Sequence, residues 1–111
     1  MDARTLTPML SVAPQITVED VAAAHAAGFR SIMCNRPDNE DPGQPDFATI
    51  AAAAAALNMP VRHVPIVTAM LTEDDLADFA RALEELPGPM LAYCRSGTRS
   101  ANVYAMVTAK E

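Results

Sequence analysis

The stretch Met90-Leu91-Ala92-Tyr93-Cys94-Arg95-Ser96-Gly97-Thr98-Arg99-Ser100 decides the fold of this chain. Its first four residues are apolar and predict a short buried strand. A polar loop follows, and residues 100–109 form a helical pattern that closes the chain. A strand that passes through a tight loop into a helix is typical of α/β proteins. Ligands in such folds bind beyond the carboxyl ends of the strands, which is where this loop lies.

The rest of the chain repeats the alternation of strand and helix. Further strands are predicted at residues 8–13, 30–35 and 61–67, and further helices at residues 17–28, 46–58 and 72–86. Prolines, glycines and acidic residues separate them. We therefore expect an α/β fold of three layers, with a mostly parallel central sheet of about four to five strands and helices on both faces. Five methionines are expected to fill its core: Met33, Met59, Met70, Met90 and Met106.

Length and charge restrict the class of protein. The chain has 111 residues, which predicts a single domain over residues 1–111. Its net charge of −6 argues against nucleic acid or an anionic membrane as a partner. No apolar run reaches the roughly 20 residues of a membrane span, so we expect no membrane segment and a cytoplasmic location. The two cysteines show no zinc-binding spacing, and no metal or cofactor is predicted.

Cys94 stands where the last strand ends and the last helix approaches. Backbone N–H groups at a helix N-terminus favour negative charge, and such a position with arginines nearby lowers the pKa of a thiol. Gly97 allows the backbone to curl so that successive N–H groups face one centre. Arg99 is placed to bind two oxygens of an anion at once. We therefore predict Cys94 and Arg99 as catalytic residues.

The remaining loop residues are predicted to complete an oxyanion-binding loop. Arg95 adds a second cation, and the hydroxyl donors are Ser96, Thr98 and Ser100. The expected ligand is a small oxyanion or a substrate that contains phosphate or sulfur. The sequence does not define the oligomeric state.

The chain resembles the phosphatase-like domain of the beta-lactamase hydrolase-like proteins over nearly its whole length. The resemblance rests on five stretches: residues 12–15 (Val-Ala-Pro-Gln), 27–29 (Ala-Gly-Phe), 35–40 (Asn-Arg-Pro-Asp-Asn-Glu), 64–66 (Val-Pro-Ile) and 89–100 around Cys94. That family is similar in fold to the dual-specificity and tyrosine phosphatases. In those enzymes a loop cysteine attacks phosphorus and a loop arginine binds the phosphoryl oxygens. The resemblance assigns these roles to Cys94 and Arg99, and implies hydrolysis of phosphomonoesters through a phosphocysteine.

Three departures from those phosphatases favour an alternative. Four residues separate Cys94 from Arg99 where five are usual, Tyr93 replaces the usual histidine, and residues 67–71 contain no acid. The four-residue spacing resembles the loop of rhodanese sulfurtransferases, in which the cysteine carries a persulfide and no general acid is required. Relatives fused to sulfur-handling metallohydrolase-like domains agree with this second interpretation. A catalytically silent domain that binds an anion or a partner is a third.

Four further residues are candidates for accessory roles. Arg36, Asp38 and Glu40 follow the second predicted strand, and either carboxylate is a candidate to hold Arg99 or to supply the missing acid. Cys34 ends that strand, which in this fold lies beside the strand that carries Cys94. It is either a small core residue or a redox partner that forms a disulfide with oxidised Cys94.

Overall fold

The computed structural model describes residues 1–109, in which five strands form one sheet. The strands are β1 (Arg4–Thr7), β2 (Leu10–Ala13), β3 (Ser31–Cys34), β4 (Val61–His63) and β5 (Met90–Tyr93). Their order across the sheet is β1-β2-β5-β3-β4. Only β1 is antiparallel to its neighbour, and the other pairs are parallel. The predicted mostly parallel α/β sheet is confirmed.

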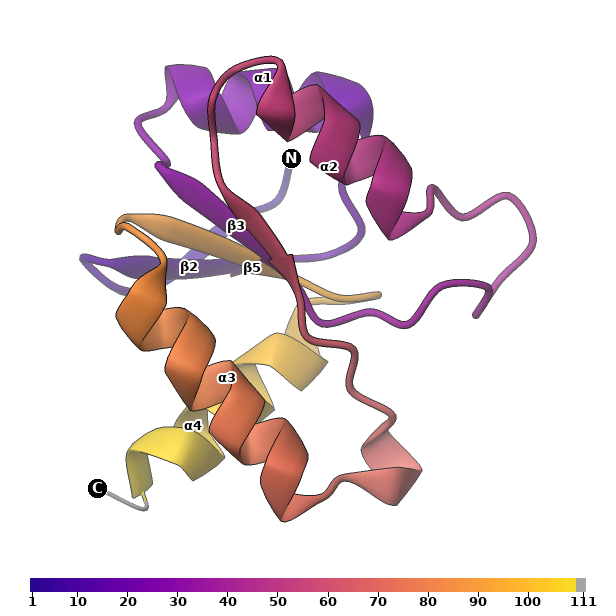
Figure 1. Ribbon diagram of the computed structural model, residues 1–111, viewed down its shortest axis with the longest axis vertical. Coiled ribbons are helices and arrows are strands. Elements are labelled where there is room, and N and C mark those ends of the chain that lie inside the picture. The colour runs from indigo at the N-terminus through magenta and orange to yellow at the C-terminus, as the bar shows by residue number, and fades with distance from the viewer. Residues whose placement is uncertain (110–111) are drawn as a thin grey trace.

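Helices cover both faces of the sheet, as Figure 1 shows. On one face lie α1 (Val18–Ala26) and α2 (Phe47–Ala55), which contact each other. On the other face lie α3 (Glu73–Glu85) and α4 (Thr98–Ala109), which form a second contacting pair. A short 3₁₀ turn, η1 (Thr68–Met70), connects the segment after β4 to α3. The three predicted layers are therefore present. None of the described helices is long and apolar enough to cross a membrane.

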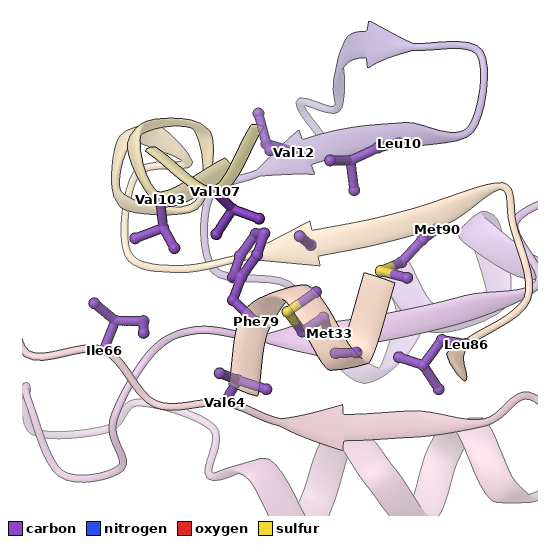
Figure 2. Packing of buried hydrophobic residues seen from close by; sticks show 12 residues of the cluster. Leu10, Val12, Met33, Val64, Ile66, Phe79, Leu86, Met90, Val103 and Val107 are labelled. Atoms are coloured by element: carbon purple, nitrogen blue, oxygen red, sulfur yellow. The ribbon is translucent and has the colours of Figure 1, made fainter. Parts of the chain in front are cut away.

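Each face of the sheet has its own buried core. Between the sheet and the α3–α4 pair, Phe79 is fully buried and packs with Met33, Val103 and Val107 (Figure 2). On the α1–α2 face the helices contribute the small side chains of Ala24 and Ala54 together with Val21 and Ile50, which pack against larger residues such as Tyr93. Alternate side chains of a strand point to opposite faces, so β3 and β5 contribute to both cores.

Three helices begin at polar caps that the sequence supplies. Thr17 accepts a hydrogen bond from Asp20 N at 3.1 Å, and the Asp20 carboxylate accepts one from Thr17 N. Thr72 and Asp75 form the same reciprocal pair at the start of α3. Asp46 accepts from Thr49 N at 2.9 Å at the start of α2. Each cap satisfies N–H groups that have no partner inside the helix, which fixes where the helix begins.

Several predicted boundaries and burials were wrong. The strand predicted at 8–13 is shorter, because residues 8–9 form the turn of an unpredicted hairpin between β1 and β2. The strand predicted at 61–67 ends at 63, and Pro65 beyond it has no N–H for a ladder. The last helix begins two residues before the predicted position. Met70 and Met106 are 72% and 44% exposed and so do not fill the core.

The sheet register brings three chain segments together at one edge. Ala13 of β2 and Cys34 of β3 both pair with Tyr93 of β5. The carboxyl ends of these parallel strands therefore lie side by side, with β5 in the middle. Residues that follow the three strands meet around Cys94, which comes directly after Tyr93.

Candidate active site

The loop after β5 is held by the backbone that follows β2. Cys94 N donates to Ala13 O at 3.2 Å, and Gln15 N donates to Arg95 O at 3.3 Å. Gly97 has φ +90°, and a Cβ on it would lie 3.3 Å from the carbonyl carbon of Ala13. A side chain at this position meets both backbone strain and a tight contact, so glycine is required for the loop to close.

Cys94 lies fully buried at the base of this loop, and its sulfur accepts a hydrogen bond from Gly97 N at 3.0 Å. Burial by itself raises the pKa of the thiol, but hydrogen bonds to the sulfur outweigh it. The N–H groups of Ser100, Ser96 and Gly97, with the Ser100 hydroxyl, hold the pKa of Cys94 below its ordinary value. The loop therefore stabilises the thiolate with backbone dipoles.

Asn35 connects Ser100 to the neighbouring strand. It is fully buried, its Oδ1 accepts from the Ser100 hydroxyl at 2.8 Å, and its Nδ2 donates to Val64 O at 3.0 Å. Asn35 was not among the predicted site residues. It directly follows the apolar strand β3, as Cys94 directly follows β5. Polar residues that end adjacent parallel strands meet at one edge of a sheet, and this pattern was the available signal.

Hydrogen bonds to Glu40 and Ile66 O occupy one edge of the Arg99 guanidinium. Its Nη1 donates to Glu40 Oε2 and to Ile66 O, both at 3.0 Å, and its Nη2 donates to Glu40 Oε1 at 3.3 Å. A guanidinium carries five N–H donors in a planar fork. Its Nε–H and second Nη2–H lie on one side, and no hydrogen bond occupies them among residues 1–109. This free side has the geometry that binds two oxygens of an anion.

Arg36 is the buried centre of an ion-pair network that reaches both loop arginines. Its Nε donates to Glu40 at 2.9 Å and its Nη2 donates to Asp41 at 2.7 Å. Glu40 in turn pairs with Arg99, and Asp41 pairs with Arg95 at 3.2 Å. Partial burial opposes ionisation of Glu40, but the hydrogen bonds from Arg99 and Arg36 lower its pKa. Glu40 is therefore a carboxylate held between two cations.

The remaining members of the predicted loop occupy distinct positions. Arg95 is 65% exposed in its side chain, so it stands at the outer rim. Ser96 is also exposed, and its hydroxyl accepts from Thr98 N at 3.4 Å. Thr98 is the first residue of α4. These residues surround the loop mouth, whereas Ser100 lies in its interior.

Asp38 and Cys34 lie apart from the loop's contacts. Asp38 accepts a hydrogen bond from Phe47 N at 2.9 Å at the start of α2, whereas the partners of Arg99 within residues 1–109 are Glu40 and Ile66 O. Cys34 is buried in the α1–α2 core, its thiol donates to Arg36 O at 3.3 Å, and burial raises its pKa. Both cysteines are free. A disulfide between Cys34 and Cys94 stays a prediction.

A cavity of about 290 Å³ adjoins the loop between α4 and the segment after β4. Its lining contains no aspartate, glutamate or histidine in the described part of the chain. Within residues 1–109 no three His, Cys, Asp or Glu side chains lie close enough to hold a metal ion. What the site offers is a thiolate, loop N–H groups and one guanidinium, which together can attack and stabilise a tetrahedral oxyanion.

Comparison with known proteins decides the family. Residues 2–111 match the family model described as "Beta-lactamase hydrolase-like protein, phosphatase-like domain". The chain belongs to this phosphatase-like domain family. A beta-lactamase hydrolase-like protein of Agrobacterium fabrum is 35% identical over 106 residues. That match covers 96% of this chain and 25% of the relative, so the chain spans about a quarter of the curated protein.

Solved structures of similar fold include proteins named as phosphatases. A protein of Neisseria meningitidis provisionally named a phosphatase is 32% identical, with a TM-score of 0.86 over 95% of this chain and 75% of its own. The core catalytic domain of the yeast PP-IP phosphatase SIW14 superposes with a TM-score of 0.73 over 96% of this chain and 64% of its own. Its identity of 10% shows similarity of fold alone. The predicted resemblance to the phosphatase-like family is confirmed.

Proposed function

We propose that this phosphatase-like domain is a cysteine-dependent phosphomonoester hydrolase with Cys94 as its nucleophile. The observation that carries the proposal is the pairing of a stabilised thiolate with a guanidinium whose free edge is unoccupied. The lowered pKa of Cys94 raises the fraction of thiolate, which is the nucleophilic form, at any given pH. Arg99 is held in place by Glu40 and Ile66 O, so its orientation is fixed before substrate arrives.

The proposed reaction has two steps. The Cys94 thiolate attacks phosphorus, an S–P bond forms, the P–O bond to the leaving group breaks, and the leaving group departs with its electron pair. Water then attacks phosphorus, the S–P bond breaks, and inorganic phosphate leaves as the thiolate is restored. Loop N–H groups and Arg99 stabilise the charge on the non-bridging oxygens in both steps.

Sulfur transfer is the second candidate, and two observations favour it. Four residues separate Cys94 from Arg99, and among the described residues the lining of the adjoining cavity contains no carboxylate or imidazole to protonate a leaving group. In this reaction the thiolate attacks the outer sulfur of thiosulfate, a persulfide forms on Cys94, and sulfite leaves. A nucleophile such as cyanide then takes the sulfur and restores the thiolate. No proton donor is needed.

The deciding experiment measures both reactions on the same purified protein. One assay follows release of nitrophenolate from p-nitrophenyl phosphate, and the other follows thiocyanate from thiosulfate and cyanide. We expect phosphate ester turnover, with a phosphoryl group on Cys94 in acid-quenched protein by mass spectrometry. Thiocyanate formation with no ester hydrolysis assigns the domain to sulfur transfer instead.

Cys94→Ser and Cys34→Ser form a matched pair of variants, because both remove a buried thiol. Cys94→Ser should abolish turnover in either assay, whereas Cys34→Ser should retain it. Turnover by Cys94→Ser at the wild-type level excludes both mechanisms. If neither wild-type reaction is detected but phosphate binds in the loop, the domain is an anion-binding module.

A further inference from the structure

The cavity beside the loop has one polar wall and one apolar wall. The polar wall contains Ser96, Thr98 and Arg99, which belong to the loop and the start of α4. The mainly apolar wall comes from two separate segments and contains four apolar side chains: Ile66, Leu71, Val103 and Met106. Thr68 and Asn102 of the same segments also line the cavity. The cavity therefore joins an oxyanion site to a hydrocarbon surface. Its volume of about 290 Å³ lies just below the roughly 300–1,000 Å³ usual for ligand pockets, which suits a small molecule.

The charge around this cavity is opposite to that of the whole chain. The chain carries a net charge of −6, yet the charged residues that line the cavity are Arg95 and Arg99. No carboxylate lines it in the described residues. Glu40 meets Arg99 from outside the cavity lining. A ligand in the cavity therefore meets positive charge at one end, which selects an anionic head group.

The apolar wall is largely formed before any ligand binds. Ile66 and Val103 are 1% and 2% exposed, so packing fixes them. Arg99 Nη1 donates to Ile66 O at 3.0 Å, which ties the oxyanion site to this wall. Met106 is 44% exposed, and its flexible thioether is suited to adjust to the ligand.

We propose that this cavity is a substrate-binding subsite for the apolar body of a small organic oxyanion, whose head group binds over Cys94. This rests on the proposed function of the loop and names the class of substrate. Apolar groups gain free energy when they leave water for such a wall, whereas a polar body loses hydrogen bonds that the wall does not replace. A compact aromatic or branched aliphatic body matches this wall.

Binding to the Cys94→Ser protein tests the subsite without turnover. Calorimetry would compare inorganic phosphate, methyl phosphate and naphthyl phosphate as ligands. We expect naphthyl phosphate to bind at least about tenfold tighter than methyl phosphate, because ring burial adds apolar contact. Met106→Gln and Leu71→Asn keep side-chain size but add an amide. Introduced into the Cys94→Ser protein, each should lower the ratio of naphthyl phosphate affinity to methyl phosphate affinity severalfold. Met9→Gln is the matched control, because Met9 is 56% exposed and precedes β2 at the opposite end of the sheet.

The outcomes separate the subsite from the proposed function. If inorganic phosphate does not bind the loop, the proposed function fails. If phosphate binds but naphthyl and methyl phosphate bind equally, the subsite is wrong and the loop proposal stands. A naphthyl preference that Met106→Gln and Leu71→Asn leave unchanged places the apolar contact elsewhere and also overturns the subsite.

Discussion

The hydroxyl of Ser100 donates a hydrogen bond of 2.8 Å to Oδ1 of Asn35, and both residues are fully buried. The Asn35 amide donates to Val64 O, which turns Oδ1 toward Ser100. A hydroxyl has one proton to donate, and the Ser100 hydroxyl also lowers the pKa of Cys94. Asn35 therefore competes with the thiolate for the Ser100 proton.

Removing this competition should change the acidity of Cys94. In Asn35→Ala the Ser100 proton is free to turn to the sulfur, so the pKa of Cys94 should fall further. In Ser100→Ala the hydroxyl is lost, so the pKa should rise. The pH dependence of iodoacetamide inactivation measures both shifts. Asn35→Ala also leaves Val64 O without its side-chain donor, and we expect a loss of about 1–3 kcal/mol in stability.

The double variant Asn35→Ala/Ser100→Ala checks the route of this effect. If Asn35 acts through the Ser100 proton, Asn35→Ala should leave the pKa of Cys94 unchanged in a protein that already lacks the Ser100 hydroxyl. An equal shift in both backgrounds shows that Asn35 acts on Cys94 by another route.

Arg99 and Arg95 should differ in their importance for oxyanion binding. Arg99 presents a free bidentate edge and has a side chain 16% exposed, whereas Arg95 is 65% exposed at the rim. Arg99→Ala should weaken phosphate binding about 10- to 100-fold, because this loss of affinity is typical when a charged hydrogen-bonding partner is removed. Arg95→Ala should weaken it only a few-fold. Equal effects in calorimetry would show that the two cations act only through net charge.

The Glu40 carboxylate predicts a defined pH dependence of stability. Its pKa in the folded protein is lowered, so its contribution is complete above its unfolded pKa of about 4.3. That contribution is lost as pH falls through the lower folded pKa. Glu40→Gln should therefore lower the melting temperature near neutral pH and approach wild type in acid. If the melting temperature of Glu40→Gln lies below that of wild type by the same amount at every pH, the carboxylate charge is not the cause of the lost stability.

Cys94 and Cys34 should differ in reactivity although both are buried in the fold. Hydrogen bonds lower the pKa of Cys94, and burial raises the pKa of Cys34. Near pH 7 iodoacetamide should therefore modify Cys94 first, because the thiolate is the reacting form. Peptide mass spectrometry after limited labelling identifies the modified residue. Faster labelling of Cys34 would contradict the proposed thiolate.

The cavity lining without an acid predicts a steep dependence of rate on the leaving group. Aryl phosphates should be hydrolysed slowly and alkyl phosphates much more slowly, because an aryl oxide leaves without a proton. General acid catalysis is worth about 10²–10⁴ in rate. Thr68→Asp introduces a carboxyl group into the cavity lining and should narrow the difference in hydrolysis rate between aryl and alkyl phosphates. Thr68→Asn is the control, because asparagine has the same shape as aspartate but donates no acidic proton. Equal rates for both esters would reveal a proton donor elsewhere.

The sequence by itself determined the layers of the fold and the loop that carries Cys94. Alternating apolar and helical segments are local patterns, and so are the caps at Thr17 and Thr72. The β1–β2 hairpin escaped prediction because β1 lies at the sheet edge, and all four of its residues are exposed or half-buried. A short edge strand has a weak periodic signal.

Only the tertiary structure decided which residues surround the thiolate. The sequence left Asp38 and Glu40 as equal candidates to contact Arg99, and the fold pairs Glu40 with it across 59 positions. Asn35 reaches Ser100 across 65 positions. A polar residue after an apolar strand indicates the edge at which it lies but not its partner, because the partner depends on the register that brings the ends of β3 and β5 together. The loop's chemistry is thus local in sequence, whereas the groups that orient it are set by strand pairing.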